Sequence, residues 1–199
     1  MVVKPPAPKH TSEGLGDKLI ISIPSLKHWV MIFFLGFWLI MWVIGEVGVL
    51  LFLILDTGKS AYDGPPIPIL ILWIIFWTIG GGYAIYQLAW QIAGKEVVEV
   101  TTQGMTISRV VLGIRSSKEY SANYIKELRV SSSNMNLNHP MMMWAYSYYS
   151  PWHHNIIGSL AFDYGAQTFR FGTSIDEAEA KQIIAEIQQK YPQYKTQVS

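Results

Sequence analysis

The sequence predicts a membrane α-hairpin of two transmembrane helices, followed by a small α+β domain. Two long apolar runs stand close together in the first half of the chain, which predicts the hairpin. The second half alternates apolar and polar residues with a period of two before a final amphipathic stretch, which predicts the domain. We expect an antiparallel β-barrel of about seven strands with a C-terminal helix.

The composition fits a membrane protein with a modest soluble part. Half of the 199 residues are hydrophobic and 15% are charged, against about a quarter charged in a typical soluble domain. The net charge of +1 argues against nucleic-acid binding. The absence of cysteine excludes disulfides, thiolate catalysis and cysteine zinc sites.

Residues 1–28 precede the first apolar run and are predicted to be a flexible leader. The first part of this leader is rich in proline, glycine and charge, which is typical of disorder. Apolar residues at Leu19, Ile21 and Ile23 recur with a period of two before Pro24. A short strand or an interfacial segment is therefore expected there.

Residues 29–92 are predicted to form the transmembrane hairpin, with spans at 29–55 and 67–92 and a turn at 56–66. The first span exceeds the about 20 residues that a helix needs to cross the hydrocarbon core, and it begins too late for a cleaved signal peptide. The short turn makes the two helices antiparallel neighbours. Lysine and arginine gather outside the hairpin, whereas the turn holds Lys59 alone, so both termini are expected in the cytoplasm.

A carboxylate and several glycines stand inside the predicted spans. Glu46 costs about 3 kcal/mol at the centre of a membrane helix, so it needs a polar partner. Candidates at a matching depth are Thr78, Tyr83 and the backbone around Gly80 to Gly82. Two interpretations stay open: a polar contact that fixes the hairpin, or a proton or ion pathway or contact with another subunit. The residues assigned to this intramembrane polar and packing site are Glu46, Gly45, Gly48, Thr78, Gly80, Gly81 and Gly82.

Residues 94–191 are predicted to form the soluble domain, and residues 192–199 a tail. The period-two pattern and its turn signals predict short antiparallel strands within 94–121, at 124–130 and across a hairpin at 156–171. A helix is predicted to follow, with Ser174 and Glu177 as a capping box and Pro192 as its stop.

This order of elements resembles a pleckstrin-homology-like (PH-like) domain. The whole chain resembles a group of uncharacterised bacterial membrane proteins in which a transmembrane hairpin precedes a PH-like domain. The matching segments are IPSLKHW, WVIGE, FWTIGGG, GKEVVEVTTQGMTISRVVLG, YIKELRV and LAFDYGAQTFRFGTSIDEAEAKQI. The resemblance implies a PH-like fold and attachment to the bacterial plasma membrane or an internal membrane, and it brings no established activity.

Residues 131–155 match no regular pattern, although 142–149 has the character of a strand. Their many aromatic and methionine side chains fit contact with a partner or with the membrane interface, or packing within the domain. The predicted contact residues are Met141, Met142, Met143, Trp144, Tyr148, Tyr149 and Trp152. A soft-metal site is the weaker alternative, because its imidazole candidates lack a ligand spacing and a nearby carboxylate cluster. These candidates are His139, His153 and His154.

Catalytic motifs are absent from the sequence: there is no nucleophile elbow, phosphate loop, HExxH or dinucleotide fingerprint. We therefore expect a non-enzymatic, membrane-anchored scaffold or accessory subunit, without cofactor, metal or nucleic acid. Its expected partners are the lipid bilayer and a membrane protein or further copies of itself. The alternative is a small oligomeric transport or channel subunit that uses Glu46. A membrane enzyme using His153 or His154 is a third reading, for which no base and orienting partner are visible.

Overall fold

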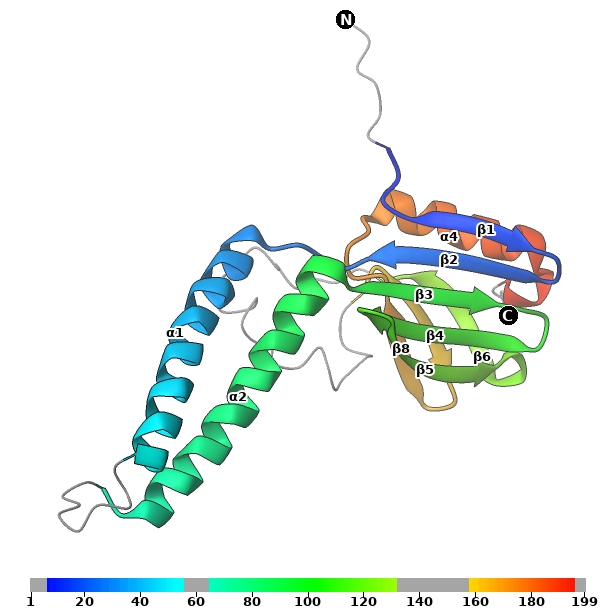
Figure 1. Ribbon diagram of the computed structural model, residues 1–199. Helices are drawn as coiled ribbons and strands as arrows, with labels where there is room; N and C mark the ends of the chain where they lie inside the picture. Colours follow the sequence, from blue (N-terminus) through cyan, green and yellow to red (C-terminus); the bar gives the residue numbers. More distant parts are fainter. Residues whose placement is uncertain (1–6, 56–64, 132–157, 196–199) are drawn as a thin grey trace, which may run out of the picture. The chain divides into compact units, whose positions relative to one another are not determined.

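The structure, a computed structural model, describes residues 7–55, 65–131 and 158–195 (Figure 1). It divides into two compact units. One is the helical unit, residues 27–92, and the other is the α+β unit, residues 1–26 together with 93–199. The helical unit therefore interrupts the sequence of the α+β unit, so that the leader and the C-terminal half belong to one fold.

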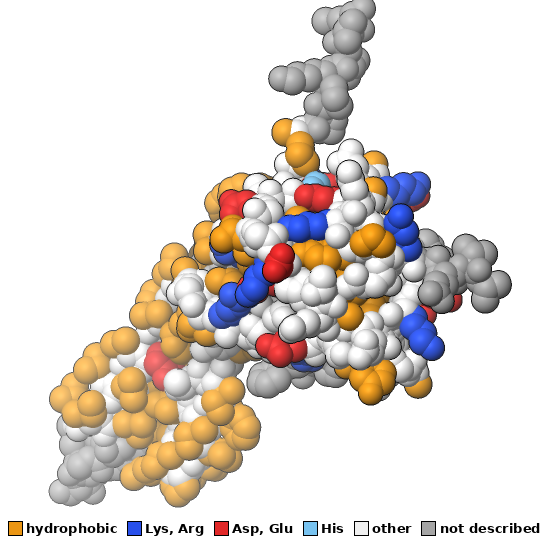
Figure 2. All heavy atoms as spheres, turned by 90° about the vertical axis from the view of Figure 1, so that its right-hand side faces the viewer, with side chains coloured by type: hydrophobic (Ala, Val, Ile, Leu, Met, Phe, Trp, Pro, Cys, Tyr) orange, Lys and Arg blue, Asp and Glu red, His pale blue; other side chains and the backbone are white. Residues whose placement is uncertain are grey.

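The helical unit consists of α1 (Trp29–Leu55) and α2 (Ile67–Ala93), each of 27 residues. Both helices are long and apolar enough to cross a membrane, since such a helix measures about 40 Å and the hydrocarbon core about 30 Å. Many of their large apolar side chains are exposed, and hydrophobic side chains cover the pair in Figure 2. The predicted spans are thus confirmed as helices, while positions 56–64 of the predicted turn lie outside the described residues.

The larger sheet of the α+β unit has five strands, and every neighbouring pair is antiparallel. Its strands follow one another in sequence order across the sheet. They are β1 (Thr11–Leu15), β2 (Lys18–Pro24), β3 (Lys95–Val100), β4 (Gly104–Val111) and β5 (Ile114–Ser121).

The pairing of β2 with β3 joins the parts of the chain before and after the helices. Leu19 lies opposite Val100, and Pro24 lies opposite Lys95. Leu19, Ile21 and Ile23 of β2 are buried in the core of the α+β unit. The expected strand before Pro24 is therefore confirmed, and a further strand, β1, which the sequence did not predict, precedes it within the leader. Strand β1 is exposed throughout and ends on an exposed leucine, so its own composition did not indicate its backbone pairing with β2.

The smaller sheet has three antiparallel strands in the order β6-β7-β8, reached from β5 through the 3-10 turn η1 (Ala122–Tyr124). They are β6 (Ile125–Val130), β7 (Leu160–Tyr164) and β8 (Gln167–Phe171). The strands predicted within 94–130 and the hairpin at 156–171 are confirmed. Among the described residues the two sheets remain separate, and the closed barrel of about seven strands is not found.

The core of the α+β unit lies between the sheets and α4 (Glu177–Lys190), the long C-terminal helix. Ile183 and Ile187 of α4 are fully buried, as is Phe162 of β7. The ring of Tyr120 meets that of Phe162 edge to face at 5.1 Å, an arrangement that aromatic pairs favour. The helix predicted at the C-terminus is thus confirmed, and its apolar face closes the core.

The start of α4 differs from the predicted capping box. Asp176 is the N-cap, and its side chain accepts a hydrogen bond from the Glu179 amide at 2.9 Å. The Ser174 hydroxyl instead donates to the Pro24 carbonyl at 2.5 Å, far away in sequence. The predicted tail is also wrong at its beginning, because η2 (Pro192–Tyr194) packs back onto the core through a buried Tyr194.

Candidate functional site

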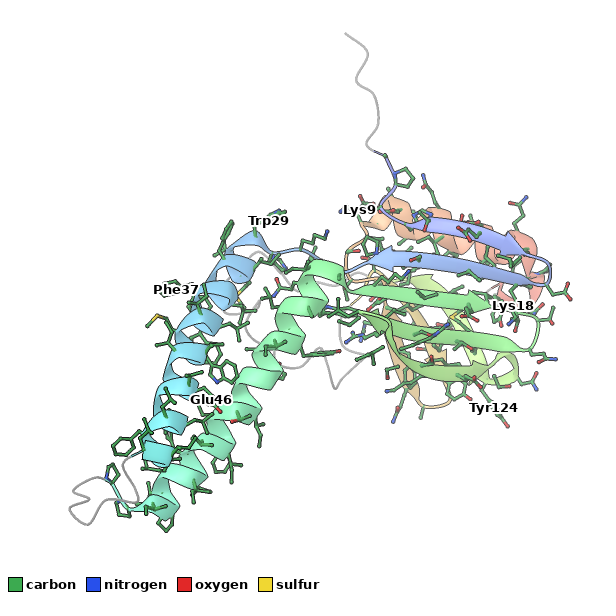
Figure 3. The ribbon with its side chains drawn as sticks, in the orientation of Figure 1. Lys9, Lys18, Trp29, Phe37, Glu46 and Tyr124 are labelled. Carbon is green, nitrogen blue, oxygen red and sulfur yellow. The ribbon has the colours of Figure 1, made fainter. Side chains whose placement is uncertain are left out.

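The polar centre of the helical unit is the pair formed by Glu46 on α1 and Thr78 on α2. The Thr78 hydroxyl donates a hydrogen bond to Glu46 Oε1 at 2.5 Å. Glu46 Oε2 is enclosed and has no hydrogen-bond partner among the residues that the structure describes. Figure 3 shows the Glu46 side chain directed from α1 toward α2. The pair therefore ties the two helices together at one depth.

Tryptophan side chains of α1 and α2 contact one another in the same unit, and they are not among the residues that the sequence predicted for the site. Trp42 Nε1 donates to the Trp77 carbonyl at 3.0 Å. The Trp77 ring stacks on Trp73 at 4.7 Å and lies 5.9 Å from Trp38. The signal that indicates the cluster is spacing, because residues four apart share one face of a helix. Trp38, Trp42 and Glu46 follow each other at this interval on α1.

One of the predicted glycines permits the close approach of the helices. A Cβ atom on Gly81 would lie 2.0 Å from Cε2 of Trp42, so no larger residue fits without a shift of the indole. A Cβ on Gly45 would lie at an ordinary 4.0 Å from Trp77 Nε1. Nothing lies within 4 Å of a Cβ on the remaining predicted glycines, Gly48, Gly80 and Gly82. Successive helical residues point about 100° apart, so only one of three consecutive glycines faces α1.

The arrangement has limited chemistry. A carboxyl group between apolar helices can accept hydrogen bonds, and the Thr78 hydroxyl supplies one. No group of three or more His, Asp or Glu side chains that could hold a metal ion occurs among the described residues. The histidines His139, His153 and His154 and the aromatic contact residues at 141–152 lie outside the described residues.

In the α+β unit, Glu96 forms a buried ion pair within the larger sheet and a hydrogen bond to the end of the smaller sheet. Glu96 Oε1 on β3 lies 3.6 Å from an Arg109 guanidinium nitrogen on β4, and both side chains are buried. The second Glu96 oxygen accepts from the Gly172 amide at 2.8 Å, just beyond β8. Since both carboxylate oxygens are used inside the fold, this pair is a structural connection.

A second ion pair crosses the smaller sheet. Arg129 on β6 donates two hydrogen bonds to Asp163 on β7, at 2.8 and 2.9 Å. The Arg129 guanidinium, helped by the Thr168 hydroxyl, holds the pKa of Asp163 below its ordinary value. Glu127 adopts a φ of 50° where the β6 register shifts. The pair therefore fixes β6 beside this irregular position.

Glu179 in the first turn of α4 holds the segment that leads into β1. Its Oε1 atom accepts from the amides of Lys9 and His10, at 2.5 and 2.8 Å, and His10 Nδ1 lies 2.7 Å away. Burial by itself raises the pKa of Glu179, but the hydrogen bonds from His10 and Lys9 outweigh it and leave the pKa below its ordinary value. The leader is thus attached to the last helix by one carboxylate.

The C-terminal end of α4 holds the turns at the opposite end of the larger sheet. Lys190 Nζ donates to the carbonyls of Gly16 and Lys18 in the β1–β2 turn, at 3.1 and 2.8 Å. The Tyr194 hydroxyl donates to the Thr101 carbonyl after β3 at 2.9 Å. Burial, with a smaller effect of Tyr191, raises the pKa of Tyr194 to about 12. Tyr194 therefore stays a neutral donor at physiological pH.

Comparisons with protein-family models, with curated proteins and with solved structures find no match for this chain. The resemblance to bacterial hairpin proteins with a PH-like domain therefore remains a prediction. The candidate site is defined by its own contacts: the hydrogen bond from Thr78 to Glu46, between two helices that are long and apolar enough to cross a membrane.

Proposed function

We propose that this chain is a membrane-anchored, non-enzymatic module. In this proposal α1 and α2 cross the bilayer as a hairpin and hold the α+β unit at one face of the membrane. The observation that carries the proposal is the pairing of β2 with β3. Because Pro24 lies opposite Lys95, the chain leaves the α+β unit and returns to it at neighbouring positions. Two antiparallel spans begin and end on the same side of a membrane, so they can connect these neighbouring positions.

We further propose a PH-like α+β unit on the cytoplasmic side, where it contacts a protein partner or the membrane surface. The two antiparallel sheets and the C-terminal helix support the PH-like assignment at the level of fold class. The cytoplasmic side is supported by the excess of lysine and arginine outside the hairpin. A structural rather than a transport role for Glu46 is supported by its bond to Thr78 and by its enclosed second oxygen.

Site-directed labelling tests the anchoring and its direction. Because the chain has no cysteine, Gln103→Cys and Lys59→Cys each introduce a unique thiol, in the α+β unit and between the spans respectively. In intact bacterial cells with a permeable outer membrane, an impermeant maleimide should label Lys59→Cys at once, and Gln103→Cys only after the inner membrane is opened. Immediate labelling of Gln103→Cys would show that the α+β unit lies on the opposite side of the membrane from the one proposed. Release of the chain by alkaline carbonate would refute the anchoring.

Copurification in mild detergent tests the proposed contact. A protein that copurifies with the full chain, and is lost when residues 139–154 are deleted, would support a scaffold role through the predicted contact region. The control is Thr102→Ala, a change at an exposed position of the α+β unit outside residues 139–154. A partner that is retained after the deletion would show that the contact lies elsewhere.

A further inference from the structure

The turn between β4 and β5 is the most apolar exposed part of the α+β unit. Leu112 and Ile114 have 73% and 78% of their surface exposed. Among the described residues of this unit, Leu15 and Tyr124 are the other exposed large hydrophobic residues, both at 61%. Two neighbouring aliphatic side chains held in water are unfavourable, since burying apolar surface is the main driving force of folding and association.

The backbone of this turn does not account for a leucine. Val111 pairs with Ile114 across a two-residue turn, in which Leu112 has φ 47° and Gly113 has φ 86°. Turns with two positive φ values favour Asn-Gly, because asparagine tolerates the left-handed region and a leucine is strained there. Leu112 therefore neither favours the backbone conformation of the turn nor packs in the core. Strain of this kind points to a contact made outside the fold.

The strand register shows where this turn lies on the sheet. Lys95 is paired with Pro24 on one side and with Val110 on the other, and Val110 is paired in turn with Arg115. These residues form one row across β2 to β5. The β4–β5 turn projects just beyond this row, at the end of the sheet where β2 finishes and β3 begins (Figure 1). We call this the junction end of the sheet.

The junction end is also where the chain passes into and out of the apolar helices. The Ser25 amide donates to the Gly94 carbonyl at 2.9 Å, one step beyond the last row. Gly94 directly follows the last residue of α2, and α1 starts shortly after Ser25. Strands lie about 4.8 Å apart and residues about 3.3 Å apart along a strand, so Leu112 lies within about 10 Å of Gly94.

We propose that Leu112 and Ile114 insert into the interfacial layer of the bilayer that α1 and α2 cross. This inference rests on the proposed membrane anchoring, and it gives the α+β unit a lipid contact besides its two covalent connections. The charge next to the turn fits this partner. Lys95, in the adjacent row, is exposed, and a cation beside inserted aliphatic groups suits the headgroup layer.

The test uses the full chain in vesicles of phosphatidylcholine and phosphatidylglycerol, with single cysteines carrying an environment-sensitive fluorophore. Leu112→Cys is compared with Leu15→Cys, which is also an exposed aliphatic site but lies at the opposite end of the same sheet. The label at position 112 should emit at shorter wavelength and lose at least half of its intensity to lipids that carry a shallow nitroxide. The label at position 15 should respond only to aqueous iodide. Equal responses at both positions would overturn the inference.

A label on α1 separates failure of this inference from failure of the anchoring. Phe37 is 68% exposed and points away from α2 in Figure 3, so Phe37→Cys should be quenched by deep nitroxide lipids. Lack of quenching at position 37 would refute the membrane hairpin itself. Quenching at position 37 but not at 112 would refute only the insertion of the turn. A blue shift at position 112 without lipid quenching would indicate a protein contact and would also refute it.

A second variant excludes an effect of misfolding. Leu112→Asn keeps a residue that suits the positive φ and removes the apolar side chain. With the fluorophore on Ile114→Cys, the added Leu112→Asn change should reduce shallow nitroxide quenching at least twofold while the circular dichroism stays the same. Unchanged quenching with an intact fold would show that Leu112 does not drive the contact.

Discussion

Thr78 on α2 donates a 2.5 Å hydrogen bond to Glu46 on α1, 32 positions earlier in the chain. Thr78→Val removes the donor and should lower the stability of the hairpin in lipid by about 1 kcal/mol, within the range measured for bonds between membrane helices. Denaturation of the full chain in bicelles by SDS, followed by tryptophan fluorescence, measures this loss. Thr78→Ser keeps the hydroxyl and is the matched control. A Thr78→Val variant as stable as the parent would indicate that Glu46 does not serve the hairpin.

The contact between Gly81 and Trp42 makes the three consecutive glycines unequal. Gly81→Ala places a methyl group where the indole lies, and we expect a loss of about 1–3 kcal/mol, as for other overpacked sites. Gly80→Ala and Gly82→Ala add a methyl group in open space and should stabilise the helix by up to about 1 kcal/mol. The same SDS titration compares the three variants. Equal effects at all three positions would contradict the close packing at Gly81.

Glu179 should make attachment of the leader depend on pH. Its pKa in the folded chain is below the ordinary value of 4.5, so the stabilisation is complete above about pH 4.5 and is lost as the pH falls through the folded value. Glu179→Gln should cost about 2 kcal/mol at pH 7, in line with hydrogen bonds to charged groups. Thermal unfolding of the full chain in nanodiscs, at pH 7 and pH 3, measures the difference between parent and variant. This difference should shrink at pH 3, and a constant difference would contradict the role of Glu179.

The leader should be essential to the α+β unit. Ile21 on β2 is completely buried, and Ile21→Ala should lower the stability of the unit by about 3 kcal/mol, as for other large-to-small core substitutions. Hydrogen exchange of the β3 amides in the intact, reconstituted chain measures the change, because β3 pairs with β2. Glu13→Ala on the exposed strand β1 is the control and should leave β3 protection unchanged. Equal protection in both variants would show that β2 is not part of the cooperative core.

Replacement of Arg129 by lysine should weaken the smaller sheet slightly. Its two hydrogen bonds to Asp163 use the planar fork of the guanidinium, which a lysine ammonium cannot reproduce. Both side chains are partly exposed to solvent, so we expect Arg129→Lys to cost about 1 kcal/mol or less. Thermal unfolding measures the cost, and Lys126→Arg on the same strand is the control. A greater loss from the control than from Arg129→Lys would contradict the assignment of the pair.

Local sequence patterns were enough to predict the helices and strands whose own residues show the pattern of that element. Length and apolar composition identify both helices, because a span must present apolar groups to lipid along its entire length. The period-two pattern identifies β3, since alternate side chains of a strand face the core, and turn signals delimit the strands that follow it. Pro192 marks the end of α4 because proline lacks the amide that continues a helix. Each of these conclusions depends on residues close together in the chain.

The tertiary structure alone decided the features that depend on distant partners. β1 has no buried face, and it is ordered by backbone pairing to β2 and by the contact of its lead-in with Glu179. Ser174 is free to bond Pro24 because Asp176 caps α4, and both residue types are good caps. The rotation of α2 against α1 selected Thr78 and Gly81 from several polar and small residues of similar depth. Composition determined that the hairpin exists, and packing determined which side chains meet inside it.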